Sequence, residues 1–143
     1  MNVGIIGAGF IGAKRAEIIG NLKKDKVVSV FDIDANKSLA LAKKIGAAAV
    51  SSGKDIFKDK RIDTVIIATI NSASARLCLE AIRNKKNVLC EKPLGINYEE
   101  AKKVFDAAKK NGVILKGGFN HRFYSAIKKA HDQKYVETLF GRR

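Results

Sequence analysis

The chain has 143 residues, and its 28 Lys and Arg residues against 14 Asp and Glu residues give a formal net charge of +14. This length fits one compact domain with a hydrophobic core and excludes a second full domain. An apolar content of 46% with 29% charged residues is typical of a globular protein and argues against disorder. The two longest uncharged stretches, Met1–Ala13 and Thr64–Ala75, are shorter than the roughly 18 residues that a membrane span needs.

Short β-branched strands alternate with amphipathic helices from the N-terminus onward. A strand at 2–6 leads through a glycine-rich turn into a helix. One face of this helix is expected to be apolar and to carry Ile11, Ile18, Ile19 and Leu22. A strand at 26–32 looks buried on both sides. Asp34 can cap the next helix, which ends at Gly46.

The same alternation continues through the second half of the chain. Strands are predicted at 47–50, 64–68, 87–90 and 113–116, with a helical turn at 54–59 and helices at about 73–84 and 97–111. The inward faces of these two helices are expected to hold Leu77, Cys78, Ala81 and Ile82, and Ala101, Val104, Phe105 and Ala108. Six strands alternating with helices predict a doubly wound parallel six-stranded sheet, a Rossmann α/β fold. We assign 1–119 to this single domain and 120–143 to a connecting helix and tail.

The turn Gly7-Ala8-Gly9-Phe10-Ile11-Gly12 matches the G-x-G-x-x-G pattern. Its first glycine permits a tight bend, its second lets the backbone approach a pyrophosphate, and its third lets the helix pack close to the strand. The helix N-terminus adds oriented N–H groups. Asp32 follows the last glycine by 32 − 12 = 20 residues, at the end of the second strand, where it can accept hydrogen bonds from an adenosine ribose. This context predicts dinucleotide binding, with a purely structural glycine-rich turn as the alternative.

The identity of the acidic residue bears on the choice of cofactor. A carboxylate at Asp32 repels the 2′-phosphate of NADP and favours NAD. Asp34 is the alternative ribose ligand if the strand runs two residues longer, although it is better suited to capping the helix. Lys14, Arg15 and Lys37 lie near enough in sequence to weaken the discrimination, so NADP stays an alternative.

Ligands of an open α/β sheet bind beyond the carboxyl ends of its strands. Three segments follow strands there: Ala68–Ser72, Glu91–Pro93 and Gly117–Arg122. Lys92, next to Pro93, is placed to contact a substrate hydroxyl or carbonyl. An ordinary surface lysine in a turn is the alternative.

Glu91-Lys92-Pro93 after Asn87–Cys90, with the glycine motif and Ala68-Thr69-Ile70-Asn71, resembles the Gfo/Idh/MocA family from residue 2 to about residue 131. These proteins are relatives of glucose-fructose oxidoreductase and inositol dehydrogenase. The resemblance implies a nicotinamide-dependent oxidoreductase that acts on a sugar, inositol or sugar-nucleotide hydroxyl, with Lys92 as the catalytic residue at that hydroxyl. The expected cofactor-binding residues are Gly7, Gly9, Phe10, Ile11, Gly12, Asp32, Thr69, Asn71 and Glu91. The expected substrate residues are Asn120, His121 and Arg122, and no metal site is expected.

The sequence departs from the family pattern in two ways. Ile70 and Ser74 replace a proline and a histidine of the family's Thr-Pro-Asn loop, so the loop should be less rigid and one cofactor contact should be lost. Family members also continue into a second domain that supplies the acid/base histidine, much of the substrate pocket and the dimer interface. We expect this chain to lack that domain and to bind NAD(H) with little or no turnover alone. His121 and His131 are the candidate substitutes for that histidine, and neither replaces it convincingly.

Other interpretations follow from charge and composition. A non-catalytic NAD-binding sensor or interaction module would need the glycine motif but not Lys92. The net charge also allows a polyanion site, although the lysine pairs are spread over the whole chain, as on solvated helix faces. Cys78 and Cys90 are expected to be buried free thiols, and the N-terminus indicates a cytoplasmic protein without a secretory signal. Phe119, Phe123, Tyr124 and Phe140 are expected to form an apolar patch for a separate second domain or a homo-oligomer.

Overall fold

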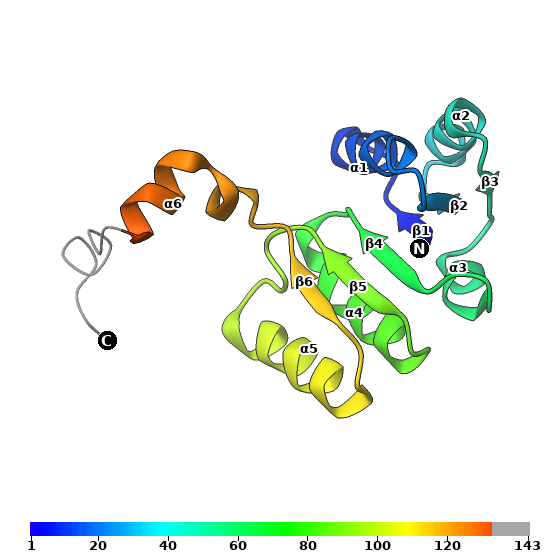
Figure 1. The fold of residues 1–143 in the computed structure, drawn as a ribbon. Helices are drawn as coiled ribbons and strands as arrows, with labels where there is room; N and C mark the ends of the chain where they lie inside the picture. Colours follow the sequence, from blue (N-terminus) through cyan, green and yellow to red (C-terminus); the bar gives the residue numbers. More distant parts are fainter. Residues whose placement is uncertain (133–143) are drawn as a thin grey trace.

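A computed structural model describes residues 1–132 and shows the predicted doubly wound sheet (Figure 1). All six strands pair in parallel, in the order β3-β2-β1-β4-β5-β6. The strands are β1 (Asn2–Ile6), β2 (Lys26–Phe31), β3 (Ala48–Ala49), β4 (Thr64–Ile67), β5 (Asn87–Cys90) and β6 (Leu115–Gly117). The strand order reverses direction between β1 and β4, where doubly wound sheets bind their ligands. The predicted fold class is therefore confirmed.

The helices divide between the two faces of the sheet. They are α1 (Phe10–Gly20), α2 (Ala35–Ile45), α3 (Gly53–Lys58), α4 (Asn71–Arg83), α5 (Tyr98–Asn111) and α6 (Ser125–Asp132), with a 3₁₀ turn η1 (Asn120–Phe123). One core cluster joins β1, β2 and β4 to α1 and α2. A larger cluster joins the opposite face to α3, α4 and α5. In Figure 1, α6 lies away from the sheet, beyond the end of β6.

Most of the predicted helix ends are confirmed by local hydrogen bonds. Asp34 caps α2 by accepting from the backbone N–H groups of Asn36 and Lys37, and Gly46 ends that helix with a φ of 70°. Asn97 accepts from the N–H of Glu100 at the start of α5. Because Asp34 is engaged as a cap, Asp32 is the carboxylate left at the carboxyl end of β2.

Two predicted apolar faces are wrong in detail. On α1 the buried residues are Gly12, Ala16 and Ile19, whereas Ile11, Ile18 and Leu22 are exposed. The first turns of the helix pack so close to β1 that the small residues Gly12 and Ala16 fill the contact, and Ile19 is the one predicted large residue that stays buried. On α5, Val104 and Ala108 are buried as expected, but Phe105 is 62% exposed. The inward face of α4 is confirmed in full.

The two cysteines are buried free thiols, as predicted. Cys78 lies on α4 and Cys90 ends β5. A hydrogen bond to Cys90, together with burial, raises the pKa of the Cys78 thiol, and the same bond lowers the pKa of Cys90. The thiol of Cys90 donates to the carbonyl of Glu91 at 3.3 Å, at the start of the Lys92 loop.

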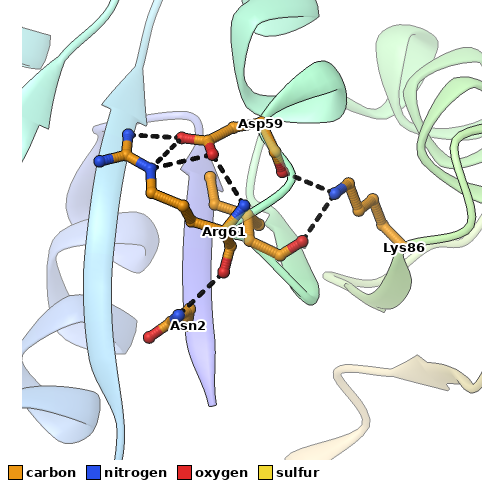
Figure 2. A network of polar contacts seen from close by, with 5 residues as sticks. Asn2, Asp59, Arg61 and Lys86 are labelled. Atoms are coloured by element: carbon orange, nitrogen blue, oxygen red, sulfur yellow. Dashed lines mark hydrogen bonds and ion pairs between the residues drawn. The ribbon is translucent and has the colours of Figure 1, made fainter.

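A polar network closes the amino end of the sheet, opposite the predicted site (Figure 2). The guanidinium of Arg61 donates to both carboxylate oxygens of Asp59, at 2.7–3.2 Å. The ammonium group of Lys86 donates to the carbonyls of Asp59 and Ile62, at 2.7 and 2.6 Å. Lys86 is only 8% exposed, so it does not lie on a solvated helix face as the lysine pairs had suggested. Its role is to satisfy buried backbone acceptors where α3 leads into β4.

Candidate cofactor and substrate site

The glycine turn has the geometry that its sequence predicts. Gly7 has a φ of 101°, and a Cβ there would overlap the carbonyl oxygen of Ala68. A Cβ on Gly12 would overlap the carbonyl oxygen of Gly7, so the third glycine lets α1 lie directly on the turn. By contrast, a Cβ on Gly9 would meet no atom of residues 1–132 within 4 Å. The second glycine therefore presents open backbone to whatever approaches the turn.

The N-terminus of α1 faces the same open space. Gly9 is its N-cap and has no side chain with which to cap the helix. The first hydrogen bond within the helix runs from the N–H of Ala13 to the carbonyl of Gly9, at 2.9 Å. The N–H groups of Phe10, Ile11 and Gly12 precede that bond and have no partner within the helix. Such an end attracts a phosphate group through its N–H groups and its dipole.

Asp32 is held beside this turn by the backbone. One carboxylate oxygen accepts from the N–H of Ala8 at 2.6 Å, and the other accepts from the N–H of Asp34 at 2.9 Å. A carboxylate offers about four lone-pair positions, so each oxygen can accept a further hydrogen bond from a ligand hydroxyl. Lys37 is one of the cations that could weaken the discrimination against NADP. Its Nζ lies 3.5 Å from Oδ2 of Asp34.

A pocket of about 280 Å³ opens at the carboxyl ends of β4, β5 and β6, next to the start of α1. All three predicted segments contribute to it. Its lining residues are Ile11, Ala68, Thr69, Glu91, Lys92, Gly118, Phe119, Asn120 and His121. The structure thus brings Lys92 together with two of the three expected substrate residues, whereas Arg122 is exposed and does not line the pocket.

The loop after β4 leads directly into α4. Ile70 is the N-cap of α4 and Asn71 is its first residue, exposed to solvent beside the pocket. Ser74 is buried, and its hydroxyl donates to the carbonyl of Ile70 at 3.2 Å. This bond ties the loop to the first turn of α4. Ser74 is therefore turned into the protein and away from any bound cofactor.

An ion pair joins α1 to the loop after β5. The Nε of Arg15 donates to Oε1 of Glu91 at 2.7 Å, and its terminal nitrogen lies 2.5 Å from the same oxygen. The terminal nitrogen also donates to the side-chain carbonyl of Asn120 at 3.0 Å. Sequence reasoning placed Arg15 near the NADP-discriminating end of the site, and the structure directs it to the opposite end. Its position three residues after the buried Gly12 on α1 could have indicated a partly inward-facing residue, but not its partner.

Comparison with known proteins identifies the family. The model described as "Oxidoreductase family, NAD-binding Rossmann fold", for Gfo/Idh/MocA proteins, matches residues 1–119. The chain belongs to the Gfo/Idh/MocA oxidoreductase family. It is an NAD-binding Rossmann domain, and the residues of the glycine turn, the α1 N-terminus and Asp32 fit such a cofactor.

Individual relatives support the same assignment. The chain is 33% identical over 133 residues to inositol 2-dehydrogenase of Rubrobacter xylanophilus, covering 90% of this chain and 38% of that protein. A crystal structure of myo-inositol dehydrogenase from Lactobacillus casei with NAD(H) and myo-inositol superposes with a TM-score of 0.88 and 26% identity, over 96% of this chain and 42% of that one. GenD2 from gentamicin A biosynthesis, in complex with NAD, gives a TM-score of 0.90 and 26% identity, over 99% and 40%.

The chain spans between 34% and 39% of the length of the first five curated relatives. Their shared region is the cofactor domain described above. Within residues 1–132 there is no helix of the length and apolarity that crossing a membrane requires. The same residues contain no group of three or more His, Cys, Asp and Glu side chains that could hold a metal ion.

Proposed function

We propose that this chain supplies the cofactor half of a dehydrogenase that acts on a secondary hydroxyl of a cyclic polyol, sugar or sugar nucleotide. The observation that carries the proposal is the position of Lys92 in the pocket beside the glycine turn. When bound, the nicotinamide cofactor would accept or donate the hydride. The substrate class is supported by relatives named for inositol and anhydro-fructose.

Each part of the site has a separate task in this proposal. The N–H groups at the start of α1 would bind the pyrophosphate, and Asp32 would accept hydrogen bonds from the adenosine ribose. Thr69, Asn71 and Glu91 would lie around the nicotinamide end. Binding the nicotinamide and the substrate hydroxyl in one pocket would convert their encounter into a reaction within a single complex.

Lys92 would act on the substrate oxygen. Its side chain is exposed at the pocket and has no ion-pair partner within residues 1–132. An ammonium group can donate a hydrogen bond to the reacting hydroxyl or carbonyl and stabilise the negative charge that develops there. Asn120 and His121 line the same pocket and would contact the remaining hydroxyl groups of a polyol.

Residues 120–143 would connect this domain to the second half of the active site. Phe119, Phe123 and Tyr124 are exposed, as an interface for a second domain or partner requires. Phe140, the fourth residue expected in this patch, lies outside the described residues. We therefore expect the acid/base group and part of the substrate pocket to come from a second domain or a separate chain.

The test is a titration of the chain with NADH and NADPH at low and moderate salt, followed by an activity assay with cyclic polyols. We expect saturable binding with a preference for NADH, and little turnover by the 143 residues alone. Lys92→Ala should leave NADH binding unchanged but abolish turnover once the second domain is supplied. Binding of neither nucleotide would refute the proposal, and unchanged turnover of Lys92→Ala would remove the catalytic role of Lys92. Saturable NADH binding without turnover, even with the second domain supplied, would favour the non-catalytic sensor.

A further inference from the structure

We infer that Arg15 is a positioning residue that fixes the loops carrying Lys92 and His121 relative to the cofactor-binding helix. This inference rests on the proposed function of the pocket. Arg15 does not line the pocket itself. It binds one residue from each of two segments that do, Glu91 after β5 and Asn120 in η1.

The planar, forked guanidinium of Arg15 has two acceptors, the side chains of Glu91 and Asn120. Nε and one terminal nitrogen of the guanidinium converge on Oε1 of Glu91, and that terminal nitrogen also reaches Oδ1 of Asn120. Arg15 is 18% exposed and Glu91 14%, so the pair is largely shielded from water and salt. A charge-assisted contact of this kind is stronger than a bond between neutral groups. A lysine offers a point charge and cannot reproduce the fork.

Glu91 is also held from its other side. A Cβ added to Gly118 would lie 2.5 Å from Oε2 of Glu91, so the carboxylate fills the space that this glycine leaves. The backbone around it is bonded as well. The N–H of Gly118 donates to the carbonyl of Cys90 at 2.8 Å, and the N–H of Glu91 donates to the carbonyl of Ile67 at 2.9 Å. The carboxylate thus lies between α1 and the end of β6.

The consequence concerns the neighbours of the two partners. Lys92 follows Glu91 and His121 follows Asn120, and both neighbours line the pocket. The glycine turn at the start of α1 is expected to hold the pyrophosphate. Its last glycine, Gly12, precedes Arg15 by three residues. Arg15 therefore fixes the distance between the cofactor's phosphates and the substrate-facing loops. Without it, Glu91 would be a half-buried carboxylate with no partner and would turn toward water.

Two variants separate this role from a direct effect of charge. Arg15→Met removes the fork and keeps the aliphatic stem. Gly118→Ala displaces the carboxylate of Glu91 by steric contact and leaves every charge in place. Arg15→Lys is the conservative control. Affinities for NADH and for ADP-ribose, which lacks the nicotinamide, are measured for each variant by calorimetry.

We expect Arg15→Met and Gly118→Ala to weaken NADH by about tenfold while ADP-ribose changes less than about twofold, with only partial recovery in Arg15→Lys. Equal weakening of both ligands by Arg15→Met, with no effect of Gly118→Ala, would overturn the inference, because Arg15 would then act as a charge for the phosphates. Unchanged binding of both ligands in both variants would overturn it as well.

Amide hydrogen exchange tests the same contact without any ligand. The amides of Glu91 and Gly118 should exchange about tenfold faster in Arg15→Met, because their loops lose the tether. The amide of Ala8, which donates to Asp32, is the internal reference and should not change. If the wild-type chain binds neither nucleotide, the proposed function fails, and exchange alone then decides whether Arg15 fixes the loops. Unchanged amide exchange rates at Glu91 and Gly118 would refute the role of Arg15 in fixing these loops.

Discussion

Replacing Gly9 with alanine should separate cofactor binding from folding. The residue has a φ of −72° and a ψ of −169°, which any L-residue can adopt, and an added Cβ meets nothing within 4 Å. Loss of a good N-cap residue costs about 1 kcal/mol, while the smaller entropy of the unfolded chain offsets a similar amount. The free energy of unfolding should therefore stay within about 1 kcal/mol of the wild type.

Binding should respond very differently. The added methyl group would occupy the open side of the turn, where a phosphate oxygen must come within about 2.9 Å of a backbone N–H. We expect NADH affinity to fall at least tenfold, or about 1.4 kcal/mol. Gly9→Val should remove binding altogether. Calorimetric titration with NADH gives the affinity, and urea unfolding followed by circular dichroism gives the stability.

Gly12→Ala is the matched control, because it should lower the free energy of unfolding, which Gly9→Ala should leave nearly unchanged. Its Cβ would overlap the carbonyl oxygen of Gly7 and lie 3.0 Å from that carbonyl carbon. Backbone atoms cannot move aside cheaply, so unfolding should become easier by about 1–3 kcal/mol. Wild-type NADH affinity in a folded Gly9→Ala variant would refute the reasoning, because the cofactor would then not approach the turn through the second glycine.

Three further predictions test the two ends of the sheet. Lys86→Met should lower the free energy of unfolding by about 1–3 kcal/mol, because it removes the ammonium donor from the carbonyls of Asp59 and Ile62, whereas the exposed Lys60→Met should change little in the same urea experiment. Arg61 hydrogen bonds lower the pKa of Asp59 to about 2 from 3.8, so the stabilisation from this pair is present above pH 3.8 and is lost as pH falls toward 2; in Arg61→Gln, carboxyl NMR titration should show the pKa of Asp59 moving back toward 3.8. Asp32→Asn should weaken NADH about tenfold or more and reduce the preference over NADPH; an unchanged ratio of the two affinities would show that Asp32 does not discriminate.

Much of the fold could be predicted because local signals agreed with the global architecture. Buried strands such as Thr64–Ile67 read as continuous β-branched runs, and Asp34, Gly46 and Asn97 marked helix ends correctly. The glycine spacing and Asp32 combined a turn, a helix start and a strand end within one βαβ unit. Such a unit is local enough for sequence spacing to specify its geometry.

The contacts that escaped prediction join residues far apart in the chain. Arg15 and Glu91 are 76 residues apart, and Lys86 meets the carbonyl of Asp59 across 27 residues. Neither pair leaves a periodic trace in the sequence. Both cations also resembled ordinary surface residues, because composition says nothing about which of the 28 basic side chains is buried. Which basic side chains are buried depends on how the helices pack against the sheet.

The error on α1 and the character of the site have one cause. A helix that presents its N-terminus to a phosphate must lie close to the strand before it, and Gly12 and Ala16 permit that approach. The larger apolar residues of its first turn are then turned away from the core: Phe10 is 80% exposed and Ile11 lines the pocket. Folding alone would not favour exposed apolar groups beside an open pocket. Their exposure is instead expected where a bound cofactor covers them, so the amphipathic pattern fails at the N-terminal end of α1, where function sets the packing.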